Sequence, residues 1–457
     1  MKKIQIYNLL FTVMLIAFAS SCKKPLDINP LNSVEQDKAF QSSKDIEVAL
    51  VGSYADMGSR NFYGGRPFVM ADFLGSTNTI EWYGTYQDIT QTYNKSILKS
   101  NSIVNSVWAV GYATINDVNN VIAALDKVDA VKKNKVEGEA KFIRGASYFD
   151  LVKVFAKSYN DGSPTTNLGV PIVLTPTKAI TEESFVTRAT VQAVYQQVIA
   201  DLTDAELKLP AANGFFATKG AAAAMLARVY LQMGNFSAAA NAANRVIIAN
   251  TYTLSPTYLG AFPVAGSVAG ANTTEDIFAI QVNTLTGFNG YNEFYGATIY
   301  NGRGDAVIAN AWMTNYEVGD DRINSFYISG GDRFTSKYAN NFGNVPIIRY
   351  AEMFLIRAEC NQRLSPAAPI GGQTPSQDLN KIRARVNLAP VIATLANILK
   401  ERKLELAFEG GFFLHDAKRT QTNIGSIAWN ANVLVFPIPQ NEMDANKNLK
   451  QNAGYIN

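Results

Sequence analysis

Residues 221–250 read AAAAMLARVYLQMGNFSAAANAANRVIIAN, and they give the strongest indication of the fold class. Leu226, Ala227 and Tyr230 recur at helical spacing, so they share one face of a first helix that ends in the turn 234–236. A second helix is lined by the small or apolar residues Ala239, Ala243 and Val246. Small residues at this helix-turn-helix spacing are typical of a tetratricopeptide repeat, whose antiparallel helices approach closely. A helical hairpin outside any repeat family is the alternative interpretation.

Apolar residues recur at three- and four-residue steps on both sides of this hairpin, so further helices are expected. One helix is predicted to run to about Met57, with Ser42 and Ser43 as candidate N-caps. The same pattern predicts helices over 102–127, 135–155, 191–207, 348–364 and 378–386. The chain therefore contains helical hairpins on both sides of its middle section.

Two regions, 58–96 and 251–345, are rich in Gly, Asn, Thr and aromatic residues and lack sustained periodicity. We interpret the first as a long ordered loop and the second as loops with short strands such as 277–282. The apolar run 170–174 is predicted to be another short strand. The expected fold is mainly α, with tetratricopeptide-like hairpins, long irregular loops and a few short strands.

The composition excludes several classes of function. With 41 Lys+Arg against 38 Asp+Glu, the 457-residue chain has no electrostatic reason to bind nucleic acid. A single His, His415, excludes a His-rich zinc or iron site, and two Cys exclude a disulfide framework or a Cys-cluster metal site. We expect no metal and no cofactor, a structural role for His415, and a buried, apolar environment for Cys360.

The first 21 residues have the features of an export signal. Lys2 and Lys3 precede the apolar run 9–19, which is shorter than the roughly 20 residues that a membrane-spanning helix needs. Small residues lead directly into Cys22, so Cys22 is predicted to be the lipid-modified first residue of the mature protein. Residues 22–32 are polar and contain two prolines, as expected of a tether. Ordinary secretion, with Cys22 an incidental thiol, is the alternative.

Charged and aromatic motifs follow one another along almost the whole mature chain. They include Leu26-Asp27, Gly52-x-Tyr54, the helix 138–151 beginning Gly-Glu-Ala-Lys-Phe-Ile-Arg, Arg349-Tyr350-Ala351-Glu352, Leu379-Asn380-Lys381-Ile382-Arg383, Glu405-Leu406-Ala407-Phe408-Glu409-Gly410, Pro437-Ile438-Pro439 and Gln451-Asn452. In this order they resemble the SusD/RagB family of Bacteroidetes outer-membrane nutrient-binding lipoproteins.

The resemblance implies a SusD-like α–α superhelical fold, with an N-terminal region at 33–250 and a C-terminal region at 251–457. It also implies a lipid-anchored protein at the surface of the outer membrane, with no catalytic activity. Its partner would be a SusC-like TonB-dependent transporter, to which it delivers a captured oligosaccharide. Two alternatives stay open: a RagB-like peptide binder and a glycoside hydrolase lipoprotein.

Glu401, Glu405 and Glu409 lie four residues apart, which predicts one stripe on a helix surface. We expect these carboxylates to form ion pairs with Arg402, Arg383 and Arg385. Catalytic carboxylates would have to flank a cleft instead, so no catalytic residues are predicted.

Loop aromatics are the best candidates for a ligand site. Eight aromatic residues lie between Phe62 and Tyr93, and a second cluster runs from Phe288 to Tyr300. A flat ring can stack on the apolar face of a sugar while amides and Arg bind its hydroxyls. The predicted site comprises Trp82 and Tyr83 as the platform, Asn61, Arg66, Asp72 and Asn78 as polar neighbours, and Tyr291 and Trp312 opposite. The alternative is that these rings pack the loops onto the helices.

Overall fold

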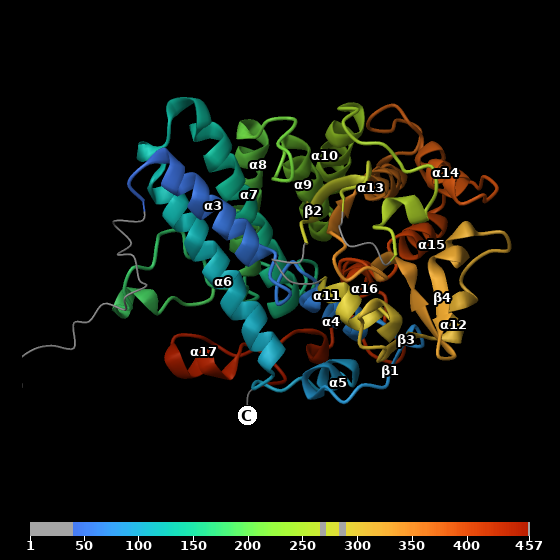
Figure 1. Ribbon diagram of the computed structural model, residues 1–457, viewed down its shortest axis with the longest axis horizontal. Helices are drawn as coiled ribbons and strands as arrows, with labels where there is room; N and C mark the ends of the chain where they lie inside the picture. The colour runs from blue at the N-terminus through green and yellow to red at the C-terminus, as the bar shows by residue number, and fades with distance from the viewer. Residues whose placement is uncertain (1–39, 266–270, 283–288, 456–457) are drawn as a thin grey trace, which may run out of the picture. The chain divides into compact units, whose positions relative to one another are not determined.

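The structure, a computed structural model, describes residues 40–265, 271–282 and 289–455 (Figure 1). The predicted signal and tether, Cys22 and Phe288 lie outside the described residues. From Ser42 onward the chain forms one compact unit. Its α-helices, within the described ranges, are α3 (Ser43–Met57), α4 (Arg66–Gly75), α5 (Gln87–Tyr93), α6 (Ser102–Ala123), α7 (Ala130–Phe155), α8 (Val191–Lys208), α9 (Lys219–Met233), α10 (Phe236–Ile248), α11 (Gly290–Tyr295), α12 (Asn310–Met313), α13 (Tyr350–Leu364), α14 (Pro375–Arg385), α15 (Leu395–Glu405), α16 (Phe412–Arg419) and α17 (Gln440–Ala445).

The long helices pack in succession, as Figure 1 shows: α7 lies between α6 and α8, α9 packs on α8 and α10, and α13 packs on α10. The predicted hairpin at 221–250 is confirmed as α9 and α10. Gly234 adopts a left-handed φ of 73°, which ends α9, and the Asn235 side chain accepts a hydrogen bond from the Ala238 N–H to start α10. Ala239 and Ala243 are fully buried, so the small residues do allow the close approach that their spacing predicts.

The predicted helix before Met57 is also confirmed. Ser42 is the N-cap of α3, and its side chain accepts from the Asp45 N–H while the Asp45 carboxylate accepts from the Ser42 N–H. This reciprocal arrangement is the capping box. It satisfies two backbone donors that would otherwise lack partners at the start of the helix.

The expectation of a long ordered loop over 58–96 is wrong, because this region contains α4, β1 and α5. Residues 66–74 of α4 are all buried, so the helix has no polar face from which a helical period could be recognised. Pro67 stands in its first turn, a position that suits the fixed φ of proline. The sequence therefore shows no helical period here, because every side of α4 is buried.

The strands are short and pair as three antiparallel two-stranded ladders. They are β1 (Ile80–Trp82) with β3 (Ala306–Ile308), β2 (Asp276–Ile280) with β6 (Val345–Arg349), and β4 (Phe326–Ser329) with β5 (Asp332–Thr335). The strand predicted at 277–282 is confirmed in β2. The strand predicted over 170–174 is wrong, because these residues join no ladder. The Val170 carbonyl accepts from the Ala189 N–H. The carbonyls of Pro171 and Val173 accept from the Tyr112 and Tyr148 hydroxyls.

Glu401, Glu405 and Glu409 do form ion pairs, but not on a surface. Each is no more than 4% exposed, and Glu409 lies beyond the end of α15. Glu401 pairs with Arg322 and Arg383, Glu405 with Arg349 and Arg385, and Glu409 with Lys337 and Arg349. Arg402, also expected to pair with these carboxylates, pairs with Glu352 and Asp416 instead. The predicted surface stripe is therefore a buried network that joins β6, α14 and α15.

His415 on α16 and Cys360 on α13 are both buried, as expected of structural residues. Burial lowers the pKa of His415 and raises that of the Cys360 thiol. Within the described ranges, no three His, Cys, Asp or Glu side chains are placed to hold a metal ion. Of the helices that the structure describes, none is long and apolar enough to cross a membrane.

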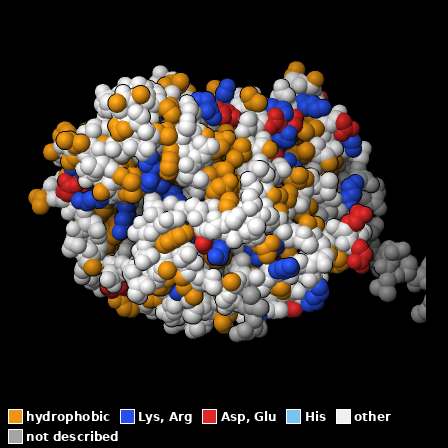
Figure 2. Space-filling model, turned by 180° about the vertical axis from the view of Figure 1, so that it is seen from behind, with side chains coloured by type: hydrophobic (Ala, Val, Ile, Leu, Met, Phe, Trp, Pro, Cys, Tyr) orange, Lys and Arg blue, Asp and Glu red, His pale blue; other side chains and the backbone are white. Residues whose placement is uncertain are grey.

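The surface carries charges of both signs. On the face turned away from Figure 1, Lys and Arg side chains are intermixed with Asp and Glu, and apolar side chains lie between them (Figure 2). This distribution agrees with the formal net charge of +3 for the whole chain.

Candidate functional site

Tyr83 stands at the end of the β1–β3 ladder. The register pairs Trp82 with Ala306, and the Tyr83 N–H donates to the Asp305 carbonyl at 2.9 Å, which extends the ladder by one bond. The Tyr83 side chain is 66% exposed, and its hydroxyl donates to Glu81 Oε2 at 2.6 Å. This hydrogen bond is the main cause that raises the pKa of Tyr83. The Tyr83 ring is thus exposed, while hydrogen bonds hold both the backbone of the residue and its hydroxyl.

Tyr86 lies beside two guanidinium groups. The Arg66 Cζ is 5.9 Å from the centre of the Tyr86 ring, and the Arg303 Cζ is 5.7 Å from it. Both distances are within the range of a cation–π interaction. Together, Asn61, Arg66, Tyr83, Tyr86 and Arg303 form what we call the Tyr83 face.

Carboxylates hold the two guanidinium groups in place. Arg66, the first residue of α4, donates through Nε and Nη2 to both oxygens of Glu293 on α11, at 3.1 and 2.8 Å. Its Nη1 donates to Asn61 Oδ1 at 2.9 Å, and Arg303 Nε donates to Asp305 Oδ2 at 2.8 Å. A two-pronged Arg–carboxylate pair fixes orientation as well as distance. The polar groups of the face are therefore positioned before any ligand arrives.

Trp82 is half-buried and has its own internal contacts. Its ring packs against Phe73 and Phe294, and its Nε1 donates to Thr90 Oγ1 at 2.9 Å. The Gly84 backbone lies so close that a Cβ there would be 2.3 Å from the Trp82 ring. Trp82 thus fastens β1 to α4 and α5, while the adjacent Tyr83 presents the open ring.

Three predicted site residues lie in the core, which corrects the expectation that they are exposed. Asp72 is completely buried, accepts a hydrogen bond from the Tyr295 hydroxyl at 3.0 Å, and has its pKa raised by burial. Tyr291 is 1% exposed and stacks on Tyr338 with ring centres 4.5 Å apart. Trp312 is also 1% exposed and donates from Nε1 to the Tyr316 hydroxyl. These side chains support the loops, which is the alternative the sequence left open.

Asn78 occupies a different place. It is exposed in the 76–79 turn with a left-handed φ of 55°, a conformation that Asn tolerates better than most residues. The described contacts do not connect it with the Tyr83 face. The structure therefore brings together Asn61, Arg66, Trp82 and Tyr83 of the predicted set.

Comparisons with known proteins agree with this architecture. Residues 26–231 match a family described as starch-binding and associating with the outer membrane, and residues 322–423 match the SusD family. SusD-like protein P2 of Formosa agariphila is 26% identical over 526 aligned residues, which span 98% of this chain and 99% of that protein. The chain belongs to the SusD/RagB family.

Solved structures show the same SusD fold. A crystal structure of a candidate sugar-binding protein of Bacteroides vulgatus has 27% identity and a TM-score of 0.78, covering 92% of this chain and all of that one. A SusD superfamily protein of the same species has 22% identity and a TM-score of 0.80, with the same coverage. The mainly helical SusD-like fold predicted from the sequence is confirmed.

Two residues of the Tyr83 face in this SusD family member were missed from the sequence. Tyr86 is one of the eight loop aromatics, and Arg303 lies in the region 251–345, which lacks sustained periodicity. Their meeting depends on the pairing of β1 with β3, which joins segments more than 200 residues apart. Spacing within either segment does not indicate this pairing, so no local signal identifies the two residues together.

Proposed function

We propose that this SusD/RagB protein captures a nutrient oligosaccharide on the Tyr83 face and delivers it to a SusC-like TonB-dependent outer-membrane transporter. Cys22 carries its lipid anchor, and the protein lies at the cell surface. The ligand stacks on Tyr83 with its apolar ring face, while the Arg66 and Arg303 side chains and Asn61 bind its hydroxyls.

The exposure of Tyr83 is the observation that carries this proposal. An amphipathic ring that is 66% exposed yet fixed by two hydrogen bonds costs little conformational entropy when it binds. A guanidinium group with donors open to solvent suits sugar hydroxyls, and Arg303 is exposed, whereas Arg66 is 8% exposed. The likeness to a candidate sugar-binding protein of Bacteroides vulgatus supports the same class of ligand.

Anchoring and delivery rest on the family and on the sequence. The matched family is described as associating with the outer membrane. The small residues before Cys22 are typical of a lipoprotein signal, and two or more acyl chains give stable anchoring. A lipid-anchored binder next to a transporter keeps its captured ligand near the pore.

The two alternatives make different demands on the surface. A peptide binder would bind mainly through backbone hydrogen bonds and would depend less on Tyr83. A glycoside hydrolase would need a pair of free carboxylates, whereas Glu401, Glu405 and Glu409 are bonded to arginines or lysine in the core.

Affinity electrophoresis of the purified full chain in gels containing soluble starch, laminarin, xylan or pectin tests the proposal. Migration should be retarded by at least one polysaccharide, and Tyr83→Ala should weaken that binding at least about tenfold, since truncating a central aromatic anchor commonly has this effect. Phe215→Ala is the matched control, because Phe215 is 62% exposed and lies outside the Tyr83 face. Equal retardation of wild type and Tyr83→Ala would overturn the assignment of the face, and peptide binding without glycan binding would favour the RagB-like alternative.

A further inference from the structure

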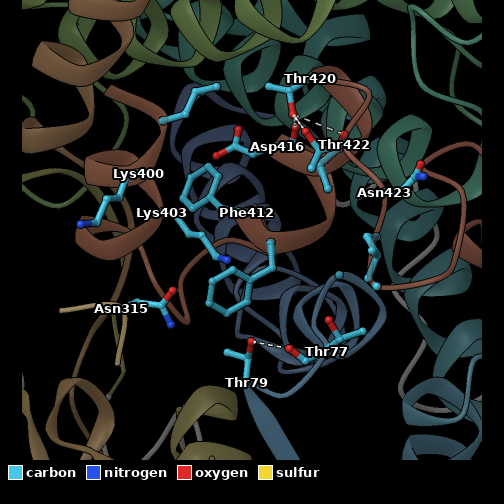
Figure 3. A pocket seen from close by; sticks show the side chains of 16 residues that line it. Thr77, Thr79, Asn315, Lys400, Lys403, Phe412, Asp416, Thr420, Thr422 and Asn423 are labelled. Atoms are coloured by element: carbon cyan, nitrogen blue, oxygen red, sulfur yellow. Dashed lines mark hydrogen bonds between the residues drawn. The ribbon is translucent and has the colours of Figure 1, made fainter. Parts of the chain in front are cut away.

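A cavity lies between the end of α4 and helices α15 and α16 (Figure 3). Its volume is about 410 Å³, within the range of pockets that bind small molecules. The walls come from segments 75–79, 399–403 and 412–425, with Asn315 at one side. None of its lining residues belongs to the Tyr83 face. We call it the Lys403 pocket.

One wall of the Lys403 pocket is apolar and rigid. Phe412 and Phe413 line it at the start of α16, and Leu399 and Ile424 extend it. The two phenylalanines are 9% and 8% exposed, so the little surface they keep includes the part that borders the cavity. Gly75 fits directly against α16, since a Cβ there would lie 2.1 Å from the Leu414 nitrogen. The end of α4 and the start of α16 therefore have little freedom to close the cavity.

The other walls carry hydroxyl and amide groups. Figure 3 shows Thr77, Thr79, Thr422 and Asn315 around the opening. Thr79 donates to the Thr77 carbonyl at 3.2 Å, and Thr420 and Thr422 are bonded at 2.9 Å. Asn315 uses its Nδ2 on the Trp312 carbonyl at 2.7 Å, which leaves its Oδ1 as an acceptor. A wall of rings facing hydroxyls and amides suits a ligand with one apolar and one hydroxylated face.

The charges of the pocket are unequal. Asp416 is bonded to Arg402 at 2.8 Å and to Arg419 at 2.6 Å. Burial alone would raise the pKa of Asp416, but the two arginines outweigh it and lower the pKa. Lys400 is paired with Glu317 at 3.4 Å. The acid of the pocket and one of its two lysines are thus already neutralised.

Lys403 is the exception. Throughout the part of the chain that the structure describes, its ammonium group is bonded to no carboxylate or carbonyl, and its described contact is with the Trp312 ring, 5.4 Å away. Lys403 is exposed as a residue, and the walls around its ammonium group remove part of its hydration, which lowers the pKa of Lys403. In Figure 3 the Lys403 side chain points into the cavity, whereas that of Lys400 points away from it. The lining of the Lys403 pocket therefore combines an exposed cation with rings and hydroxyls.

We propose that the Lys403 pocket binds one acidic sugar unit, a hexuronate, with its carboxylate on Lys403 and its carbon skeleton against Phe412 and Phe413. The hydroxyls of the sugar bond with Thr77, Asn315 and Thr422. A neutral sugar would leave Lys403 without a partner, and a bare anion would leave the rings and hydroxyls unused. The pocket is independent of the Tyr83 face and would keep this role whatever that face binds.

Isothermal titration of the purified full chain with sodium glucuronate, glucose and sodium acetate tests this assignment. Glucuronate should bind at least tenfold more tightly than either glucose or acetate. Lys403→Gln should weaken glucuronate binding at least tenfold, and Lys400→Gln should change it less than twofold. Lys400 is the matched control because it lies one turn away on the same helix. Lys400→Gln removes the same charge as Lys403→Gln.

Several outcomes would overturn the proposal. One is no measurable binding at about 20 mM glucuronate. The others are acetate or glucose binding as tightly as glucuronate, and the two lysine variants weakening glucuronate binding equally. If Lys403→Gln melts at a lower temperature, Thr77→Val provides the second test, since it removes a hydroxyl from the far wall and should weaken glucuronate binding at least threefold. Tyr83→Ala should leave glucuronate binding unchanged, which separates this test from that of the proposed function.

Discussion

Glu352 on α13 binds Arg228 on α9 within the core, with Arg228 Nη2 2.6 Å from Glu352 Oε2. The Glu352 side chain is completely buried, and Arg402 on α15 donates to its other oxygen at 3.2 Å. One carboxylate thus joins three helices. Burial alone would raise the pKa of Glu352, but the charges of Arg228 and Arg402 outweigh it and hold the pKa below its usual value of 4.5.

Glu352→Gln should lower the free energy of unfolding by about 3–5 kcal/mol at pH 7, because it removes the carboxylate that binds the buried Arg228 and one of the two that bind Arg402. A carboxyl whose pKa is lowered on folding stabilises the protein above its unfolded pKa, and this stabilisation is lost as the pH falls through the folded pKa. The difference between wild type and variant should therefore narrow below about pH 4.5. Urea denaturation across pH 3–7 measures it. Glu47→Gln is the control, since the half-exposed Lys132–Glu47 pair should contribute at most about 1 kcal/mol.

Trp82→Ala should mainly reduce stability, by about 2–4 kcal/mol, because the ring packs on Phe73 and Phe294 and its Nε1 bonds Thr90. Glycan affinity at temperatures where the variant is folded should fall less than in Tyr83→Ala. Thermal melting together with affinity electrophoresis checks both effects. An unchanged melting temperature combined with a thirtyfold weaker affinity would instead make Trp82 the platform.

Ala239→Trp should destabilise the α9–α10 hairpin by about 1–3 kcal/mol or more, since Ala239 is fully buried where the helices touch. Asn241→Trp places the same ring two residues later on the exposed side of α10 and should be nearly neutral. Chemical denaturation of the two variants compares them directly. Equal stability of the two would mean that α10 is rotated about its axis from the position described.

Cys22→Ala should move the protein from the membrane fraction to the soluble fraction while its helical circular dichroism stays unchanged. The expectation comes from the sequence, in which a short apolar run ends at Ser20-Ser21-Cys22. Cell fractionation in a strain without the partner transporter is the measurement. If the variant still sediments with membranes there, another segment must anchor it.

The helices with one polar face could be predicted from the sequence, because local spacing reports burial on the other face. The cap at Ser42 and the turn at Gly234 could be predicted as well, since a cap or a left-handed glycine acts within a few residues of itself. The buried helix α4 could not be predicted in this way, because its residues are apolar or internally paired on every side. Tertiary packing alone determines its conformation.

The candidate site was predictable only in part for a related reason. Tyr83 and Tyr291 both stand in aromatic, glycine-containing segments, yet one is 66% exposed and the other 1%. What separates them is whether a distant element covers the ring: Tyr338 stacks on Tyr291, while Tyr83 ends a ladder that nothing caps in the described structure. The composition therefore indicates which segments form the site, whereas the strand pairing determines which of their residues are exposed.

The buried charge network has a consequence for how the chain is made. Glu275, directly before β2, meets Arg349 on β6 and Arg385 on α14. The two arginines follow it by 74 and 110 residues, and both also pair with Glu405. During synthesis the N-terminal part of the chain is made first, so each of these charges is exposed long before its last partner has been made. Burying one of them alone costs several kcal/mol. We therefore expect the segment from β2 to α15 to stay open during synthesis and to close in one late step. A polypeptide cut short before residue 405 would lack that closing step and would remain accessible to proteases, so the network makes completion of the chain a condition for its survival.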